Sequence, residues 1–160
     1  MSGVGRQLRR TVPAVLTTAV VGGLGTRPRS AWYLSLRKPP WQPPPAAFGP
    51  AWTTLYALIA ASTAQALAEA GPEERRRIER AAWLNLGLNA AWSWLFFTAR
   101  RPDLALAGIL ALDLSNADLA RRVGRVDARA GAALTPYLAW TWFATALNAD
   151  ILRRNRAGLR

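Results

Sequence analysis

Long uncharged stretches alternate with short charged ones along the chain. No charged residue occurs in the ranges 11–26, 39–68, 81–99 and 130–149. A helix that crosses a bilayer needs roughly 20 mostly apolar residues. The last three of these stretches reach that length, and the first nearly does. The pattern therefore predicts long apolar helices joined by charged connections.

Turn and capping residues predict where five helices begin and end. We expect Thr11 to cap the first helix, Gly71 and Pro72 to close the second, and Asp103 to cap the fourth. The sequence EERRRIER then forms the connection between the second and third helices. The expected helices cover residues 11–26, 48–70, 79–100, 103–123 and 129–152. We therefore predict an all-α fold, with residues 1–160 forming one membrane domain of five transmembrane helices.

The segment between the first two expected helices is rich in proline and aromatic residues. Proline removes backbone donors and blocks regular helix. Flexible linkers are poor in aromatics, whereas this segment contains Trp32, Tyr33, Trp41 and Phe48. We interpret it as an ordered loop outside the membrane.

The charge distribution favours a membrane over other partners. Lys and Arg number 21 and Asp and Glu 9, a net charge of +12 that suggests nucleic-acid binding at first sight. The arginines, however, gather at the ends of the apolar stretches, where cations meet lipid headgroups. A water-soluble bundle is the alternative, but soluble helices carry charges along one face. We expect an integral membrane protein with lipid around it and no nucleic-acid partner.

Composition also narrows the chemistry. The chain has no Cys and no His, which excludes thiol nucleophiles and His-based metal or acid–base sites. We therefore expect no metal site and no required cofactor. Asp113 is a candidate proton site in the polar fourth helix, and it would support a cation-coupled exporter.

Aromatic and amide residues share faces on two of the expected helices. These faces carry Asn85, Asn89, Trp92, Ser93 and Phe96 on one helix and Tyr137, Trp140, Ala144 and Asn148 on the other. Aromatic rings stack on flat ligands, and amides orient them by hydrogen bonds. The pattern indicates a pocket for a flat hydrophobic ligand such as a porphyrin. An interfacial aromatic belt and hydrogen bonds between helices are the alternatives.

Two motifs carry a family resemblance. WYxxLxKPxWxPP begins at Trp32, and FGPxWTxLY begins at Phe48. From about residue 11 to 155 the chain resembles the tryptophan-rich sensory protein or translocator protein family (TspO, peripheral benzodiazepine receptor), of bacterial type. The resemblance implies a five-helix bundle of the bacterial cell membrane, inner or outer, commonly a homodimer. It also implies binding of protoporphyrin IX, haem, other tetrapyrroles, benzodiazepine-site drugs and sterols, with a role in tetrapyrrole regulation, transport or stress sensing.

The resemblance also assigns residues by position. The positions that match the family's ligand pocket are Tyr33, Trp52, Asn89, Trp92, Trp140 and Ala144. Those that match the loop closing it are Trp41, Pro43 and Phe48. Some bacterial members degrade protoporphyrin in light, and this implies Trp52 and Trp140 as candidate catalytic residues of an enzyme-like alternative. Ala149 and Asp150 depart from the sterol motif of animal members, which puts sterol binding there in doubt.

Overall fold

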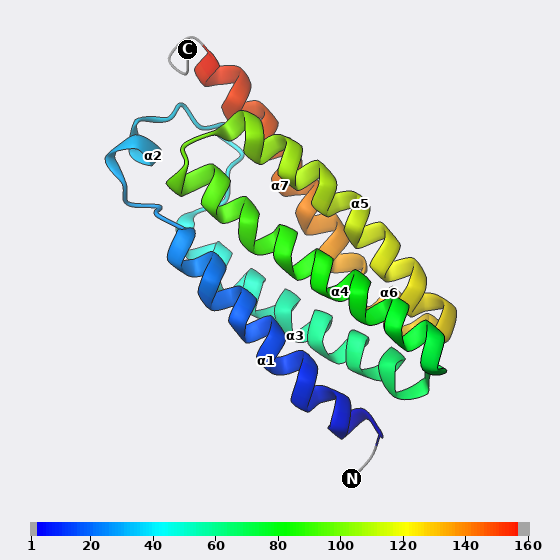
Figure 1. Cartoon of the computed structure of the whole chain (residues 1–160). Helices are drawn as coiled ribbons and strands as arrows, with labels where there is room; N and C mark the ends of the chain where they lie inside the picture. Colours follow the sequence, from blue (N-terminus) through cyan, green and yellow to red (C-terminus); the bar gives the residue numbers. More distant parts are fainter. Residues whose placement is uncertain (1–2, 157–160) are drawn as a thin grey trace.

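The computed structural model describes residues 3–156, which form an elongated bundle of helices with no strand (Figure 1). The elements are α1 (Gly3–Gly25), α2 (Ala31–Ser35), α3 (Pro45–Glu69), α4 (Pro72–Ser93), a π-helical segment η1 (Trp94–Thr98), α5 (Pro102–Val126), α6 (Ala128–Ala132) and α7 (Thr135–Asn155). Short α2 and the end of α7 lie at one end of the bundle, and the start of α1 lies at the other. The predicted all-α class is confirmed for the described residues.

Helix α1 begins at Gly3, so the prediction that Thr11 caps it is wrong. Thr11 lies inside the helix, where its side chain is buried and its Oγ1 donates to the Ala60 carbonyl at 3.0 Å. The charged first turns are helical because Gln7 and Thr11 bury one face of α1. The exposed arginines on the other face stay solvated.

Two further helices begin earlier than predicted. Pro44 and Pro45 start α3, because proline fits the first helical turn, so Phe48 lies in a helix and not in the loop. EERRRIER is helical rather than a connection. Glu73 and Glu74 occupy the first turn of α4, where the helix dipole favours carboxylates.

The last two predicted helices also differ in detail. Asp103 does not cap α5; it lies in the first turn and pairs with Arg101, whose backbone precedes the helix. The predicted helix over 129–152 is divided into α6 and α7. Asp127 caps α6 by accepting from the backbone N–H groups of Arg129 and Ala130, and Pro136, which has no N–H, starts α7 afresh.

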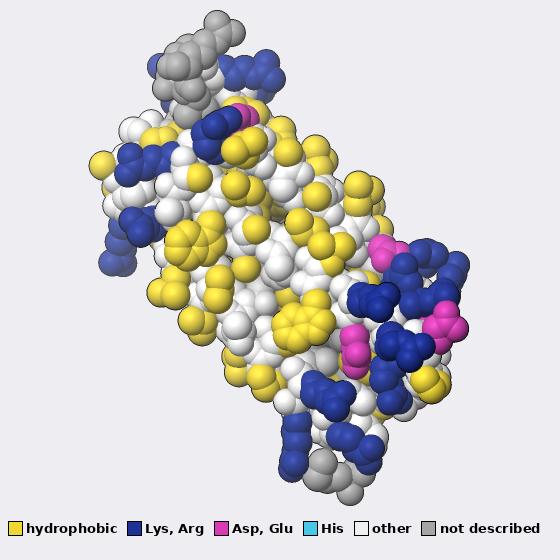
Figure 2. All heavy atoms as spheres, in the orientation of Figure 1, with side chains coloured by type: hydrophobic (Ala, Val, Ile, Leu, Met, Phe, Trp, Pro, Cys, Tyr) yellow, Lys and Arg dark blue, Asp and Glu magenta, His cyan; other side chains and the backbone are white. Residues whose placement is uncertain are grey.

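The surface separates apolar from charged side chains. Figure 2 shows hydrophobic side chains over the middle of the visible face, with Lys and Arg gathered at the two ends. The exposed large apolar side chains include Leu16, Val20, Leu110, Leu114 and Trp142. Even so, none of the described helices is both long enough and apolar enough to qualify as a membrane span by mean hydropathy.

Candidate functional site

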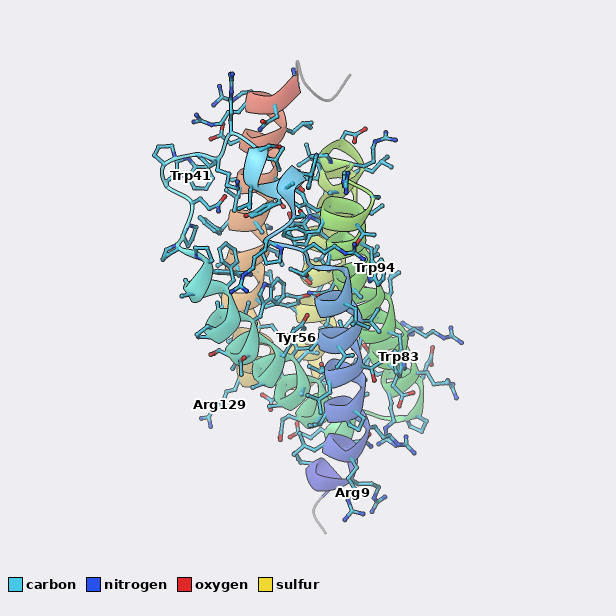
Figure 3. The ribbon with its side chains drawn as sticks, turned by 90° about the vertical axis from the view of Figure 1, so that its left-hand side faces the viewer. Arg9, Trp41, Tyr56, Trp83, Trp94 and Arg129 are labelled. Atoms are coloured by element: carbon cyan, nitrogen blue, oxygen red, sulfur yellow. The ribbon has the colours of Figure 1, made fainter. Side chains whose placement is uncertain are left out.

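An aromatic cluster fills the space between α3, α7 and the proline-rich loop. Trp140 on α7 meets Phe48 and Trp52 of α3 edge-on, at centroid distances of 5.8 and 6.4 Å. Phe143 lies 5.6 Å from Trp140 and 5.7 Å from Trp41 of the loop. In Figure 3, Trp41 lies beside α7, on the opposite side of the bundle from Trp83 and Trp94. Helix spacing of three or four residues brings the rings on α7 together.

A groove of about 740 Å³ opens beside this cluster. Ligand sites in proteins span about 300 to 1,000 Å³, so the groove has the size of a binding site. Its walls are almost entirely apolar and come from α3, α7 and the loop. The lining residues are Pro43, Pro50, Ala51, Thr54, Leu55, Pro136, Ala139, Trp140 and Phe143.

Two tryptophans of this cluster have indole N–H groups that can still form a hydrogen bond. Trp52 and Trp140 are half-buried, and neither indole N–H has a hydrogen-bond partner among the residues that the structure describes. By contrast, the Trp92 indole donates to Asn148 Oδ1 at 3.1 Å, and the Trp94 indole donates to the Val21 carbonyl at 2.9 Å. Trp140, which lines the groove, can therefore donate a hydrogen bond to a molecule in it, while Trp52 packs against the Trp140 ring.

Tyr33 and Trp92 belong to a second aromatic cluster, beneath α2. Trp92 stacks on Phe96 at 5.4 Å, and Tyr33 lies 5.1 Å from Phe97. Gln42 Nε2 donates to the Tyr33 hydroxyl at 3.2 Å, and the Lys38 ammonium lies 4.4 Å from the centre of the Tyr33 ring. This cluster fixes the loop on the bundle, next to the groove but outside its lining.

Burial changes the acid–base behaviour of the loop residues. Desolvation raises the pKa of the Tyr33 phenol, and the hydrogen bond from Gln42 offsets part of that rise. Desolvation also lowers the pKa of the Lys38 ammonium. Both groups are thus pushed toward their neutral forms.

Asn89 lies inside the bundle, in a network of buried polar groups. Its Oδ1 accepts from the Tyr56 hydroxyl at 2.9 Å, and its Nδ2 donates to the Tyr137 hydroxyl at 2.8 Å. The Tyr137 hydroxyl donates to Asn85 Oδ1 at 3.1 Å, and Asn85 continues to Asn116 of α5. The Asn89 side chain is 5% exposed. In this structure its amide joins α3, α4 and α7, and it does not line the groove.

Two other residues singled out by the sequence lie away from the groove. Ala144 is half-buried on α7 and is not part of the lining. Asp113 is half-buried between α5 and α7, where its Oδ2 accepts from the Thr145 hydroxyl at 2.7 Å. Its buried Oδ1 has no partner in the described part of the chain.

Of the expected ligand residues, only Pro43 and Trp140 line the groove. Phe48 and Trp52 contact the Trp140 ring, and Trp41 contacts the ring of Phe143, another lining residue. Most of the residues that line the groove were not predicted from the sequence. The missed residues are Pro50, Ala51, Thr54, Leu55, Pro136, Ala139 and Phe143. Small and apolar residues three or four apart, such as Ala51, Thr54 and Leu55, are the signal that marks such a wall.

The described residues include no group of three or more His, Cys, Asp or Glu placed to hold a metal ion. The fold and the groove together define a helical bundle with an open apolar groove between α3 and α7, to which Trp140 and Phe143 contribute aromatic rings.

Comparison with known proteins identifies the family. The chain matches the model of the TspO/MBR family over residues 11–154. It is 36% identical over 150 residues to the "Tryptophan-rich protein TspO" of Archaeoglobus fulgidus, a match that covers 93% of this chain and 97% of that protein. It is 34% identical over 126 residues to the human "Translocator protein", covering 78% and 75%. It is 33% identical over 124 residues to the "Tryptophan-rich sensory protein" of Cereibacter sphaeroides, covering 78% and 77%.

The chain therefore belongs to the TspO/MBR family. Proteins of this family are membrane proteins, so family membership, rather than the hydropathy of the helices, assigns the chain to a membrane.

Proposed function

We propose that this protein binds porphyrins and related tetrapyrroles in the groove between α3 and α7. The observation that carries the proposal is the open, apolar groove of about 740 Å³ lined by the Trp140 indole, whose N–H has no partner among residues 3–156 and against which Trp52 packs. A flat macrocycle matches such a site, because it offers a large apolar face for stacking and polar edges for hydrogen bonds. Trp41 and Pro43 then close the loop end of the groove.

We also propose that the bundle spans the bacterial cell membrane. Helices α1, α3, α5 and α7 have 21 to 25 residues each. At a rise of about 1.5 Å per residue they are roughly 32 to 38 Å long, against a hydrocarbon core of about 30 Å. Exposed apolar side chains cover the middle of the visible face and charges its ends (Figure 2). A ligand could thus enter the groove sideways from lipid.

The relatives' names support a role in sensing or transport. They include "Tryptophan-rich sensory protein" and "Translocator protein". Binding that changes the position of the loop could serve either role, because the loop contributes both the Pro43 wall and the Trp41 ring to the site.

A titration with protoporphyrin IX tests the proposed site. The full chain in detergent should show quenching of tryptophan fluorescence. The Trp52→Ala, Trp140→Ala double variant should bind at least tenfold more weakly, because the aromatic wall at Trp140 and the ring that supports it are both lost. Trp142→Ala is the matched control, since that side chain is exposed outside the groove. Unchanged affinity in the double variant would reject the site.

Light-dependent porphyrin degradation is a second candidate. Its support is the pair of indoles, Trp52 and Trp140, with ring centroids 6.4 Å apart at the groove. An oxidisable indole stacked on a photoexcited porphyrin can exchange an electron with it. Under illumination, Trp52→Phe and Trp140→Phe together should slow pigment loss while binding persists. Equal loss with and without the two indoles would remove this candidate.

A further inference from the structure

A second cavity lies toward the opposite end of the bundle from α2. It has a volume of about 520 Å³ and is bordered by α1, α3 and α4. Its walls combine basic, hydroxyl and apolar side chains, unlike those of the groove. The lining residues that bear on what the cavity could bind are Arg9, Arg10, Pro13, Thr63, Glu79 and Trp83.

Thr63 lines this cavity and has an unpaired hydroxyl. Its side chain is 3% exposed, and its Oγ1 is buried without a hydrogen-bond partner in the described chain. Threonines in helices often donate to the carbonyl four residues earlier. Thr53 and Thr54 of the same helix do so, at 3.0 and 3.1 Å. Leaving a buried polar group without a partner is unfavourable, so a partner that occupies the cavity would explain the unpaired Thr63 hydroxyl.

Pro13 exposes a further polar atom near the same wall. Proline has no N–H, so the carbonyl of Arg9, four residues earlier in α1, loses its usual helical donor. Arg9 and Pro13 both border the cavity. A hydroxyl-bearing ligand can therefore donate to the Arg9 carbonyl.

The mouth of the cavity carries a net positive charge. Arg10 and Glu79 approach to 3.9 Å, and no ion pair to Arg9 occurs among residues 3–156. Two arginines and one glutamate leave one positive charge. Figure 3 shows Arg9 near the start of α1, with Trp83 higher on neighbouring α4. Trp83 is 63% exposed, and tryptophan is enriched at the level of lipid headgroups.

We propose that this cavity binds one anionic phospholipid. Its phosphodiester pairs with Arg9 and Arg10, an ester carbonyl accepts from the Thr63 hydroxyl, and an acyl chain runs past Trp83. A phosphodiester carries the single negative charge that matches the mouth. The proposal rests on the membrane position of the bundle and not on porphyrin binding.

Brominated lipids test the proposal, because bromine on the acyl chain quenches nearby tryptophans. The full chain is placed in mixed micelles with brominated phosphatidylglycerol or brominated phosphatidylcholine. Subtracting the signal of Trp83→Phe isolates the quenching of Trp83. We expect saturable quenching that prefers the anionic lipid. Arg9→Gln should weaken it about fivefold, since a basic residue near a lipid surface contributes about 1 kcal/mol.

Thr63→Val preserves the shape of the side chain and removes the hydroxyl. We expect it to weaken the anionic lipid about two- to tenfold, the range for loss of one hydrogen bond. Arg6→Gln and Thr53→Val are the matched controls, because both residues are exposed and lie outside the cavity. Circular dichroism checks that each variant is folded.

Equal quenching by both lipids, unaffected by Arg9→Gln and Thr63→Val, would overturn the proposal in favour of non-specific surrounding lipid. Displacement of the brominated lipid by millimolar inorganic phosphate would also overturn it, because the cavity would then take a soluble anion. Protoporphyrin titrations on the same samples report on the α3–α7 groove separately. Failure there leaves the lipid result intact, so the two proposals are rejected by different outcomes.

Discussion

At the scale of single residues, the buried amides and the half-buried indoles have different tasks. Asn85, Asn89 and Asn116 bond to one another or to buried hydroxyls, so their polar atoms are satisfied within the bundle. Trp52 and Trp140 lack such partners among residues 3–156. We therefore expect the Trp140 indole N–H, and not the buried amides, to make polar contact with a ligand in the groove, while the amides determine how the helices pack.

Replacing Asn89 should show this structural task. Asn89→Ala leaves the Tyr56 hydroxyl without its acceptor and removes one donor to the Tyr137 hydroxyl, which still donates to Asn85. We expect it to lower the free energy of unfolding by about 1 to 3 kcal/mol. Tyr56→Phe in the Asn89→Ala background should cost less than Tyr56→Phe alone, because the two share one hydrogen bond. Denaturation in detergent measures all three variants. Additive effects would contradict the network.

The Tyr33 phenol gives a pH prediction. Burial raises its pKa in the folded protein above the usual value of 10.0. The resulting stability is fully present below pH 10 and is lost as the pH rises toward the higher folded value, because the unfolded chain releases its proton first. Unfolding free energy should thus fall above pH 10, and Tyr33→Phe should reduce that fall. An identical pH profile for the variant would show that Tyr33 is not buried as described.

The residues of the site could be predicted only in part. Repeating aromatics and the resemblance of the motifs lead to Trp140 and Pro43, because these patterns are local in sequence. They do not separate Tyr33 of α2 and Trp92, which pack on Phe97 and Phe96, from Trp52, which packs against Trp140 at the groove. Helical spacing identifies a face, whereas the neighbouring helix decides what that face meets.

At the scale of elements, α1 approaches the end of α4 closely enough to require glycine. A Cβ on Gly25 would lie 2.8 to 2.9 Å from three atoms of the Trp94 indole, which also donates to the Val21 carbonyl. Trp94 is the first residue of the π-helical segment, where the wider backbone places its ring against α1.

Two alanine substitutions in α1 should therefore have opposite effects. Gly25→Ala should destabilise the fold by about 1 to 3 kcal/mol, the cost of overpacking a tight contact. A Cβ on Gly23 would have no neighbouring atom within 4 Å, so Gly23→Ala should stabilise the helix by about 0.5 to 1 kcal/mol. Unfolding curves of the two variants, compared with the natural chain, measure the difference. Equal effects would mean that the contact is absent.

Which segments are helical could be predicted, but their ends could not. Four uncharged stretches follow from the hydrophobic pattern alone, and the turn and capping residues around Asp103 predict the fifth, more polar helix. The start of α1 at Gly3 and the division near Leu134 depend on how charged turns are solvated and where Pro136 falls. A hydroxyl residue such as Thr11 can either cap a helix or form a hydrogen bond to another helix, and here the hydroxyl of Thr11 bonds to α3.

At the scale of the whole molecule, two dissimilar cavities lie toward opposite ends of one bundle. The groove by the loop is apolar, whereas the cavity by the start of α1 carries arginines and a free hydroxyl. On α3 the two linings come within one helical turn of each other, at Leu55 of the groove and Ile59 of the cavity. We propose that the groove by the loop binds the tetrapyrrole and that the other cavity binds lipid.

Occupation of the α3–α7 groove is the central claim, and filling the groove tests it most directly. Ala139→Trp places a large side chain in the groove wall, whereas Ala146→Trp places the same side chain on an exposed part of α7 outside it. Protoporphyrin IX should bind at least tenfold more weakly to the first variant and normally to the second, with both retaining the helical content of the natural chain. Equal affinity for both variants would contradict the account.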